Sequence, residues 1–236
     1  MLLAGVSVDI HCFVKPAAES CNGAAFEDRF SFFAEVPKLA PGTFSFAAEI
    51  GIREAFGNHA ALCGAVSGFR QLLLSPRLYT TGVPFADRER ACEELRELSS
   101  AGVQQIVLRL NEKEARRLDL DCVRNLVEAC QAAGTVLWLQ FELHDTFSED
   151  CLRIARMVED RQFTVTVLPV RVRPTRRMAL HEALPLQAGE RVQLLLKAAG
   201  EVALRRTTQN EVIEICVGNA QDRPLGELIA AVRARG

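Results

Sequence analysis

Helical and extended patterns alternate three times between residues 87 and 172, and this alternation allows few folds. Acidic residues in a first turn and an apolar stripe at helical spacing predict helices, whereas short apolar runs between them predict buried strands. The predicted helices are Asp87–Ser100, Leu120–Ala133 and a third that follows Ser148 as its N-cap. The predicted strands are Gln105–Leu110, Thr135–Leu143 and Phe163–Val172, the last broken by Pro169. Because the connections are short, the pattern predicts βαβ units, a mostly parallel sheet and therefore an α/β fold.

The two ends of the chain differ from this middle region. Nine of the thirteen phenylalanines lie before residue 71, and alternating apolar and polar residues predict strands over Gly5–Val14 and Thr43–Ile52. The Ala- and Gly-rich segment His59–Gly68 fits either a helix or a loop. The C-terminal pattern predicts short strands at Gln193–Lys197, Glu201–Leu204 and Glu211–Val217, then a helix from Pro224 to Arg233. We expect a Phe-rich N-terminal module (1–75), an α/β domain (76–200) and a C-terminal hairpin with a helix (201–236).

The charge balance disfavours nucleic acid as a partner. The chain has 28 Lys and Arg against 30 Asp and Glu, for a net charge of −2. Arg171–Arg177 is the only basic concentration, and without interleaved aromatic residues it predicts a solvated loop or a protein contact. No apolar run reaches the roughly 18 residues of a membrane span, and the N-terminus lacks the basic start of a signal peptide. We therefore expect a cytoplasmic protein without a membrane span.

The chain has eight cysteines, and their spacing limits what they can do. They occupy positions 12, 21, 63, 92, 122, 130, 151 and 216. No two are separated by two or three residues, which excludes a local zinc knuckle, a Cys-x-x-Cys redox pair and an iron–sulfur loop. We interpret most of them as reduced, buried thiols that pack as small apolar side chains. A dispersed metal site that uses Cys12 and Cys21 with His11 or Cys63 stays open as an alternative.

Polar residues follow the predicted strands at their carboxyl ends, where parallel α/β sheets bind ligands. The candidate ligand-binding residues are Glu112 after the first strand, Glu142, His144 and Asp145 after the second, and Arg171 and Arg173 after the third. Together they could bind an anionic or amino-acid-like ligand. His144 beside Asp145 also fits a general base with an orienting carboxylate. The chain contains no Ser nucleophile elbow, Walker loop or G-x-G-x-x-G motif.

The order of these segments from about residue 76 resembles radical S-adenosylmethionine (SAM) enzymes of the peptide-modifying kind. Residues 107–113 (Val-Leu-Arg-Leu-Asn-Glu-Lys) are similar to the family strand that ends in Gly-Gly-Glu-Pro. This similarity puts Glu112 where the family's Glu contacts the amino group of the cofactor. Residues 135–142 occupy the next strand, and residues 217–229 resemble the Gly-Asn end of SPASM/twitch-type extensions. The resemblance implies a partial (β/α) barrel.

The chain departs from the family at the cluster motif. The three thiolates spaced Cys-x-x-x-Cys-x-x-Cys would fall in Leu78–Arg88, which contains no cysteine. Leu110 and Asn111 replace the two glycines before Glu112, and Cys216 is the extension's only thiol. The resemblance therefore implies a pseudoenzyme with no catalytic residue, no metal ligand and no iron–sulfur cluster, and it disfavours SAM binding.

Two functions are consistent with this sequence. The first is a non-catalytic partner subunit, in a heterodimer with an active radical SAM homologue, that binds this enzyme, its peptide substrate or both in a modification or maturation pathway. The alternative is a stand-alone, metal-free α/β enzyme that acts on a small polar or anionic substrate through Glu112, His144 and Asp145.

Overall fold

A computed structural model describes most of the chain and divides it into two compact units. The described residues are 7–14, 44–50, 55–56, 59–71, 75–143, 146–159, 166–171, 173–183, 191–197, 201–220 and 222–233. Unit 1 comprises Met1–Val14, Cys21–Ala48 and Arg173–Gly236, and unit 2 comprises Lys15–Ser20 and Glu49–Val172. The three-part division inferred from the sequence stays a prediction, and each unit is described by itself.

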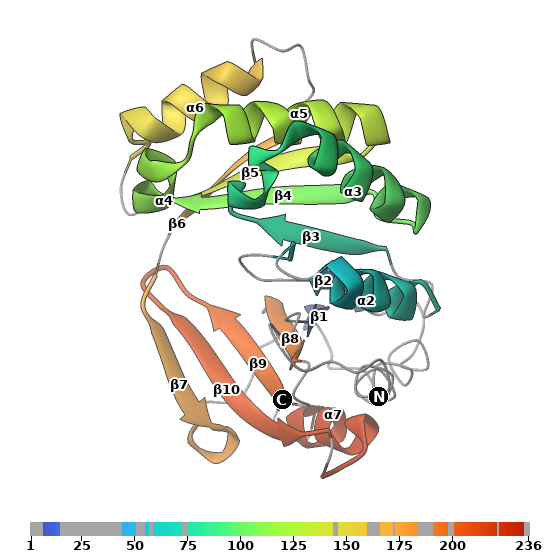
Figure 1. Cartoon of the computed structure of the whole chain (residues 1–236). Coiled ribbons are helices and arrows are strands. Elements are labelled where there is room, and N and C mark those ends of the chain that lie inside the picture. The colour runs from blue at the N-terminus through green and yellow to red at the C-terminus, as the bar shows by residue number, and fades with distance from the viewer. Residues whose placement is uncertain are drawn as a thin grey trace. The chain divides into compact units, whose positions relative to one another are not determined.

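Unit 2 is built on four parallel strands that are adjacent in the order in which they occur in the chain (Figure 1). The strands are β3 (Pro76–Thr80), β4 (Gln105–Asn111), β5 (Val136–Leu143) and β6 (Thr166–Arg171). The helical segments are α2 (His59–Gln71), η2 (Val83–Ala86, a 3₁₀ turn), α3 (Arg88–Ser100), α4 (Glu112–Arg117), α5 (Leu120–Ala133) and α6 (Glu149–Glu159). A helix or a helix pair thus separates each strand from the next, as the alternating sequence pattern predicts.

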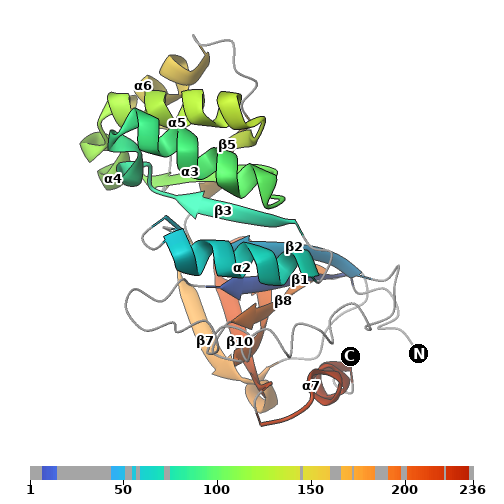
Figure 2. The same ribbon diagram turned by 45° about the vertical axis from the view of Figure 1, so that its right-hand side comes forward.

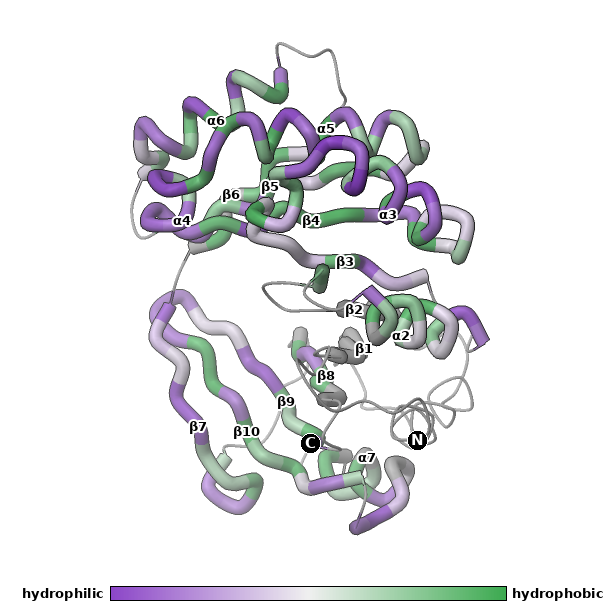
Figure 3. The backbone as a smooth tube through the Cα atoms, viewed as in Figure 1, coloured by the Kyte–Doolittle hydropathy of each residue, from purple (hydrophilic) through white to green (hydrophobic). Residues whose placement is uncertain are grey.

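The helices α3, α5 and α6 lie on the same side of this sheet (Figure 1). Side chains alternate between the two faces of a strand, so each strand presents one set of residues to the helices. One set is fully buried and comprises Ile106, Leu108 and Leu110 of β4 and Leu137, Leu139 and Phe141 of β5. Figure 3 shows hydrophobic residues along β4 and hydrophilic residues along α3. The apolar core of unit 2 therefore lies between the sheet and its helical layer.

The opposite face of the sheet is more polar. The register brings Arg77, Trp138, Arg109, Gln140 and Glu142 to this face, and all five are half-buried. Parallel strands that alternate with helices along the chain are the pattern of an α/β fold. The fold class is thus confirmed as mixed α/β with a parallel sheet. The described strands form no closed sheet.

Unit 1 contains a mixed sheet in which β1 pairs parallel with β8, β8 antiparallel with β9, β9 antiparallel with β10, and β10 parallel with β7. The bounds are β1 (Ser7–Val14), β7 (Thr175–Ala179), β8 (Arg191–Lys197), β9 (Glu201–Thr207) and β10 (Val212–Asn219). The unit also contains η3 (Leu180–Glu182) and α7 (Leu225–Arg233), and the strand β2 (Phe44–Ile50) begins in unit 1 and ends in unit 2. A Cβ added at Gly218 would lie 2.7 Å from Leu228 Cδ2, so this glycine permits α7 to pack close to β10.

The sequence predicted most of these elements but missed five. The predicted hairpin is β9–β10, and the ambiguous segment His59–Gly68 belongs to the helix α2. The strand β6 continues through Pro169, so the predicted break is wrong; β6 is the last of the described strands in the sheet order, and a missing N–H is tolerated at such a position. The elements β3, η2, α4, β7 and η3 were not predicted. Among the described residues, no helix is both long and apolar enough to span a membrane.

The core position of Leu108 gives a stability test. Leu108 is 1% exposed, whereas Val83 is 64% exposed. We expect Leu108→Ala to lower the free energy of unfolding by roughly 2–5 kcal/mol, because it leaves a cavity in the core. The matched truncation Val83→Ala should change it by less than about 0.5 kcal/mol. Urea unfolding followed by circular dichroism measures both, and equal effects would contradict the assigned core.

Candidate functional site

The carboxyl edge of the unit 2 sheet collects three of the residues predicted from the sequence. Asn111 is in register with Glu142, Glu112 follows Asn111 directly, and Leu143 is in register with Arg171. His144 and Asp145 lie outside the described residues. Arg173 belongs to unit 1, where its Nε donates a hydrogen bond to the Gln209 carbonyl at 3.2 Å. Ligand binding by these residues stays a prediction, and the two units are not treated as one site.

Glu112 is the first residue of the short helix α4, which a capping box fixes at the end of β4. Asn111 Oδ1 accepts from the Glu114 amide at 3.0 Å, and Glu114 Oε2 accepts from the Asn111 amide at 2.9 Å. This reciprocal pair satisfies two amides at the start of the helix. The signal was present in the sequence as Asn-x-x-Glu, but no helix was predicted there. Glu112 is therefore a half-buried residue of a first helical turn.

Glu142 is held by an arginine on the neighbouring strand. Arg109 Nε donates to Glu142 Oε1 at 2.7 Å, and Nη2 of the same guanidinium contacts that oxygen. The Arg109 and Glu142 side chains are 25% and 12% exposed, so the pair is shielded from most solvent. A charge-assisted bond in this setting is stronger than one on the surface. The guanidinium thus compensates the carboxylate predicted to bind a ligand.

Arg77 and Trp138 extend the same face of the sheet. The Arg77 guanidinium carbon lies 5.1 Å from the centroid of the Trp138 ring, a cation–π contact between β3 and β5. Sequence reasoning missed Arg77 and Arg109, although Arg109 stands between two leucines of a buried strand. A charged residue between two buried leucines of a strand lies on the opposite face of the sheet and indicates that this face is polar.

The loop after β3 lies within Leu78–Arg88, where the resemblance in segment order predicts the cluster motif. Gly82, at φ 86°, donates its amide to the buried Thr80 Oγ1 at 3.0 Å, and the Phe85 amide donates to the Gly82 carbonyl at 3.1 Å. Asn125 of α5 donates to the Phe85 and Ala86 carbonyls at 2.9 and 3.2 Å. Hydrogen bonds to the side chains of Thr80 and Asn125 thus fix the backbone of this loop.

An aromatic side chain fills the centre of the same loop. Phe85 is 1% exposed and packs edge-on against Phe56 with the ring centroids 4.9 Å apart. A cluster needs thiolates that converge on one point, and Leu78–Arg88 supplies no thiol. The residues present therefore do not fit an iron–sulfur cluster at this position.

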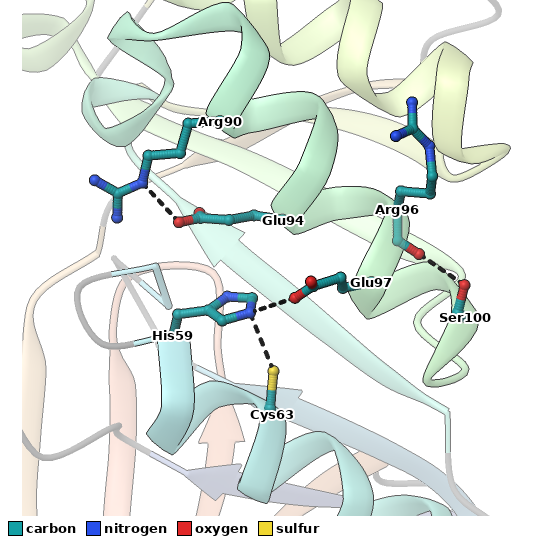
Figure 4. A network of polar contacts seen from close by, with 7 residues as sticks. All are labelled: His59, Cys63, Arg90, Glu94, Arg96, Glu97 and Ser100. Atoms are coloured by element: carbon teal, nitrogen blue, oxygen red, sulfur yellow. Dashed lines mark hydrogen bonds and ion pairs between the residues drawn. The ribbon is translucent and has the colours of Figure 1, made fainter.

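A second polar cluster, which the sequence did not predict, joins α2 to α3 (Figure 4). His59 Nε2 lies 2.8 Å from Glu97 Oε2 and 3.4 Å from Cys63 Sγ, one helical turn along α2. His59 Nδ1 is buried and has no hydrogen-bond partner in the described part of the chain. Figure 4 shows the ring, the thiol and the Glu97 carboxylate facing one another. A thiol, an imidazole and a carboxylate are the residue types of a nucleophilic site.

The arrangement does not activate the thiol. An activated cysteine needs one ring nitrogen for the thiol and the other for an orienting acceptor, but both groups here meet Nε2. Burial, followed by the carboxylates of Glu97 and Glu94, raises the pKa of Cys63 above its usual value. Because the thiolate is the nucleophile, a raised pKa makes this cysteine less reactive. We assign the cluster a role in connecting the two helices.

The other cysteines with resolved shifts are also poor nucleophiles. Burial raises the pKa of Cys130 to about 12, and it is also the main cause that raises the pKa of Cys122. Cys130 and Cys151 are fully buried, as expected for thiols that pack as apolar side chains. Of the dispersed metal candidates, Cys21 lies outside the described residues. The part of the chain that the structure describes holds no group of three or more His, Cys, Asp or Glu suited to a metal ion.

No protein-family model matches this chain, and no curated protein matches it.

The pair Arg109–Glu142 gives a test of the polar face. We expect a double-mutant cycle of Arg109→Ala and Glu142→Ala to give a coupling energy of roughly 1–3 kcal/mol, because the two groups share a charge-assisted hydrogen bond that is shielded from most solvent. The exposed pair Arg124–Asp121 on α5 is the control and should couple by less than about 1 kcal/mol. Chemical denaturation measures both cycles, and equal coupling would contradict the shielding of the sheet pair.

The raised pKa of Cys63 predicts slow alkylation at neutral pH. Iodoacetamide should react with Cys63 more slowly than with an ordinary thiol at pH 7, and faster as pH rises above the usual value of 9.0. Glu97→Gln removes one carboxylate that disfavours the thiolate and should increase the rate at pH 8. Glu128→Gln, on α5, is the matched control. Mass spectrometry after timed labelling reads each site, and fast labelling at pH 7 would refute the assignment.

Proposed function

We propose that this chain is a non-catalytic partner subunit related to radical SAM enzymes of the peptide-modifying kind. It binds an active homologue, the peptide substrate of that homologue, or both, within a heterodimer. One observation carries the proposal: the loop after β3, where the family binds its cluster, is closed around Phe85 and supplies no thiol. The β-strand and helix order of unit 2 is compatible with the barrel half that the resemblance implies.

The polar groups at the strand ends also support a binding role over catalysis. Arg109 compensates Glu142, and Glu112 lies in the first turn of a capped helix. A general base needs an available lone pair within reach of the proton that it removes. The pair Arg109–Glu142 instead has the properties of a structural ion pair, which orders the face of a sheet without a reacting group.

Anaerobic purification from the native host tests this proposal. The tagged chain should capture a protein whose sequence contains Cys-x-x-x-Cys-x-x-Cys, identified by mass spectrometry, and the complex should contain iron. The chain produced alone should be colourless, should not bind SAM in calorimetry and should not cleave it. An unrelated protein with the same tag is the control.

Two results would overturn the proposal. One is a monomeric protein with a turnover of its own that Glu112→Ala abolishes without a change in melting temperature, since this is the behaviour of the stand-alone enzyme. The other is a host complex that lacks any protein with the cluster motif.

A further inference from the structure

The strand β7 (Thr175–Ala179) ends the strand order of unit 1. Among the described strands, only β10 pairs with it, and Figure 2 shows the two strands side by side. Its residues Thr175, Arg176 and Arg177 are exposed. No described strand pairs with the other edge of β7, and an extended segment can add as a further strand to the N–H and C=O groups of such an edge.

A row of alternating charges runs across the sheet and ends at this edge. The register places Arg205 of β9 opposite Glu214 of β10, and Glu214 opposite Arg177 of β7. Side chains directly opposite one another on neighbouring strands share a face and interact. The order of charges toward the edge is therefore positive, negative, positive. A further strand continues the alternation if it places a carboxylate beside Arg177.

Arg205 and Glu214 form a hydrogen-bonded ion pair, whereas Arg177 at the edge makes no hydrogen bond with Glu214. Arg205 Nη2 donates to Glu214 Oε1 at 2.6 Å, and the Glu214 side chain is 9% exposed. Arg177 Nε lies 3.7 Å from Glu214 Oε2, too far for a hydrogen bond, and its side chain is 73% exposed. Glu214 thus forms its hydrogen bond with Arg205, and the exposed Arg177 guanidinium can still donate hydrogen bonds to another carboxylate.

Arg176 and Arg177 make this edge basic, and their charge favours an acidic partner strand. Arg176 is also exposed, and its Nε is 3.7 Å from Glu211, again beyond hydrogen-bond distance. If two copies of β7 paired antiparallel about the central residue, Arg177 would face Arg177, and like charges directly opposite are destabilising. This repulsion disfavours pairing between copies and favours an acidic strand.

We propose that β7 is a docking site for an extended acidic segment of a partner polypeptide, which adds as a strand and places a carboxylate opposite Arg177. The inference rests on the proposed role of the chain as a binding subunit, and it specifies the chemistry of the bound segment. Main-chain hydrogen bonds along β7 hold the segment, and the pairing with Arg177 fixes its register.

Peptide binding to the full-length chain tests this inference. The probe is a short, fluorescently labelled peptide with Glu at every second position and Thr between, compared by anisotropy with peptides that carry Gln or Lys in place of Glu. We expect the Glu peptide to bind tightest and the Lys peptide to bind weakest. Arg177→Glu should weaken binding of the Glu peptide by roughly fivefold or more, because one cross-strand attraction becomes a repulsion. In that variant the Lys peptide should bind better than the Glu peptide.

Arg223→Glu is the matched control, because it makes the same charge change at an exposed residue outside the strands of unit 1. It should preserve the affinity for the Glu peptide and the order of the three peptides. Equal affinity for the three peptides, an equal loss in both variants, or no reversed preference in Arg177→Glu would overturn the inference. Arg177→Gln provides a second reading if the reversed charge lowers the melting temperature, and it should abolish the preference for Glu over Gln.

The result is separable from the test of the proposed function. If the peptide binds but no cluster-bearing enzyme is captured, the docking site at β7 stands and the proposed partner enzyme is overturned. Capture of that enzyme with unchanged affinity in Arg177→Glu would retain the partner and overturn the docking edge.

Discussion

The contact between the apolar face of the parallel sheet and its helical layer is the constraint on which unit 2 depends. On the face toward the helices, alternate residues of β4 and β5 are fully buried, whereas the opposite face combines the buried Val107 with half-buried polar residues. Each fully buried leucine contributes about 1.5–3 kcal/mol to folding, so this face dominates the stability of the unit. Because the period of a strand is two residues, the same contact forces the intervening residues onto the opposite face.

The opposite face is therefore polar, and its polar groups stabilise one another. Arg109 compensates Glu142, and Arg77 lies over Trp138. The helical layer has its own polar contact in the cluster of His59, Cys63 and Glu97. In each of these contacts a charged or titratable group is bound by a neighbour, and in the His59 cluster both the thiol and the carboxylate meet Nε2. Such pairing is what permits charges to lie near a core.

Unit 1 presents its charges differently. Its charge row is tightly paired at Arg205 and Glu214 but ends at an exposed strand edge with Arg177. The edge of a strand can donate and accept main-chain hydrogen bonds with another segment. A helix cannot do this along its length, because its main-chain groups bond to one another. Binding through β7 is thus consistent with a chain whose contribution is recognition, and it requires no reacting group.

The sequence by itself determined the local structure of this protein. The helices α3, α5 and α6 and the strands β4, β5 and β6 follow from hydrophobic periodicity, whereas the short helix α4 does not. The end of α5 follows from Gly134 in a left-handed conformation. The absence of a cysteine in Leu78–Arg88 is likewise a property of the sequence alone. Polar candidates at strand ends were found for the same reason, because parallel strands end at one edge of the sheet.

Only the tertiary structure decided which charged side chains pair with one another. Arg109 lies 33 positions from Glu142, and Arg177 lies 37 positions from Glu214, so no local pattern could pair them. The short strands β3 and β7 were missed because five residues carry little periodicity, and they exist because a neighbouring strand pairs with them. Strand register, which depends on distant hydrogen bonds and burial, places one carboxylate beside an arginine and leaves another arginine at an open edge.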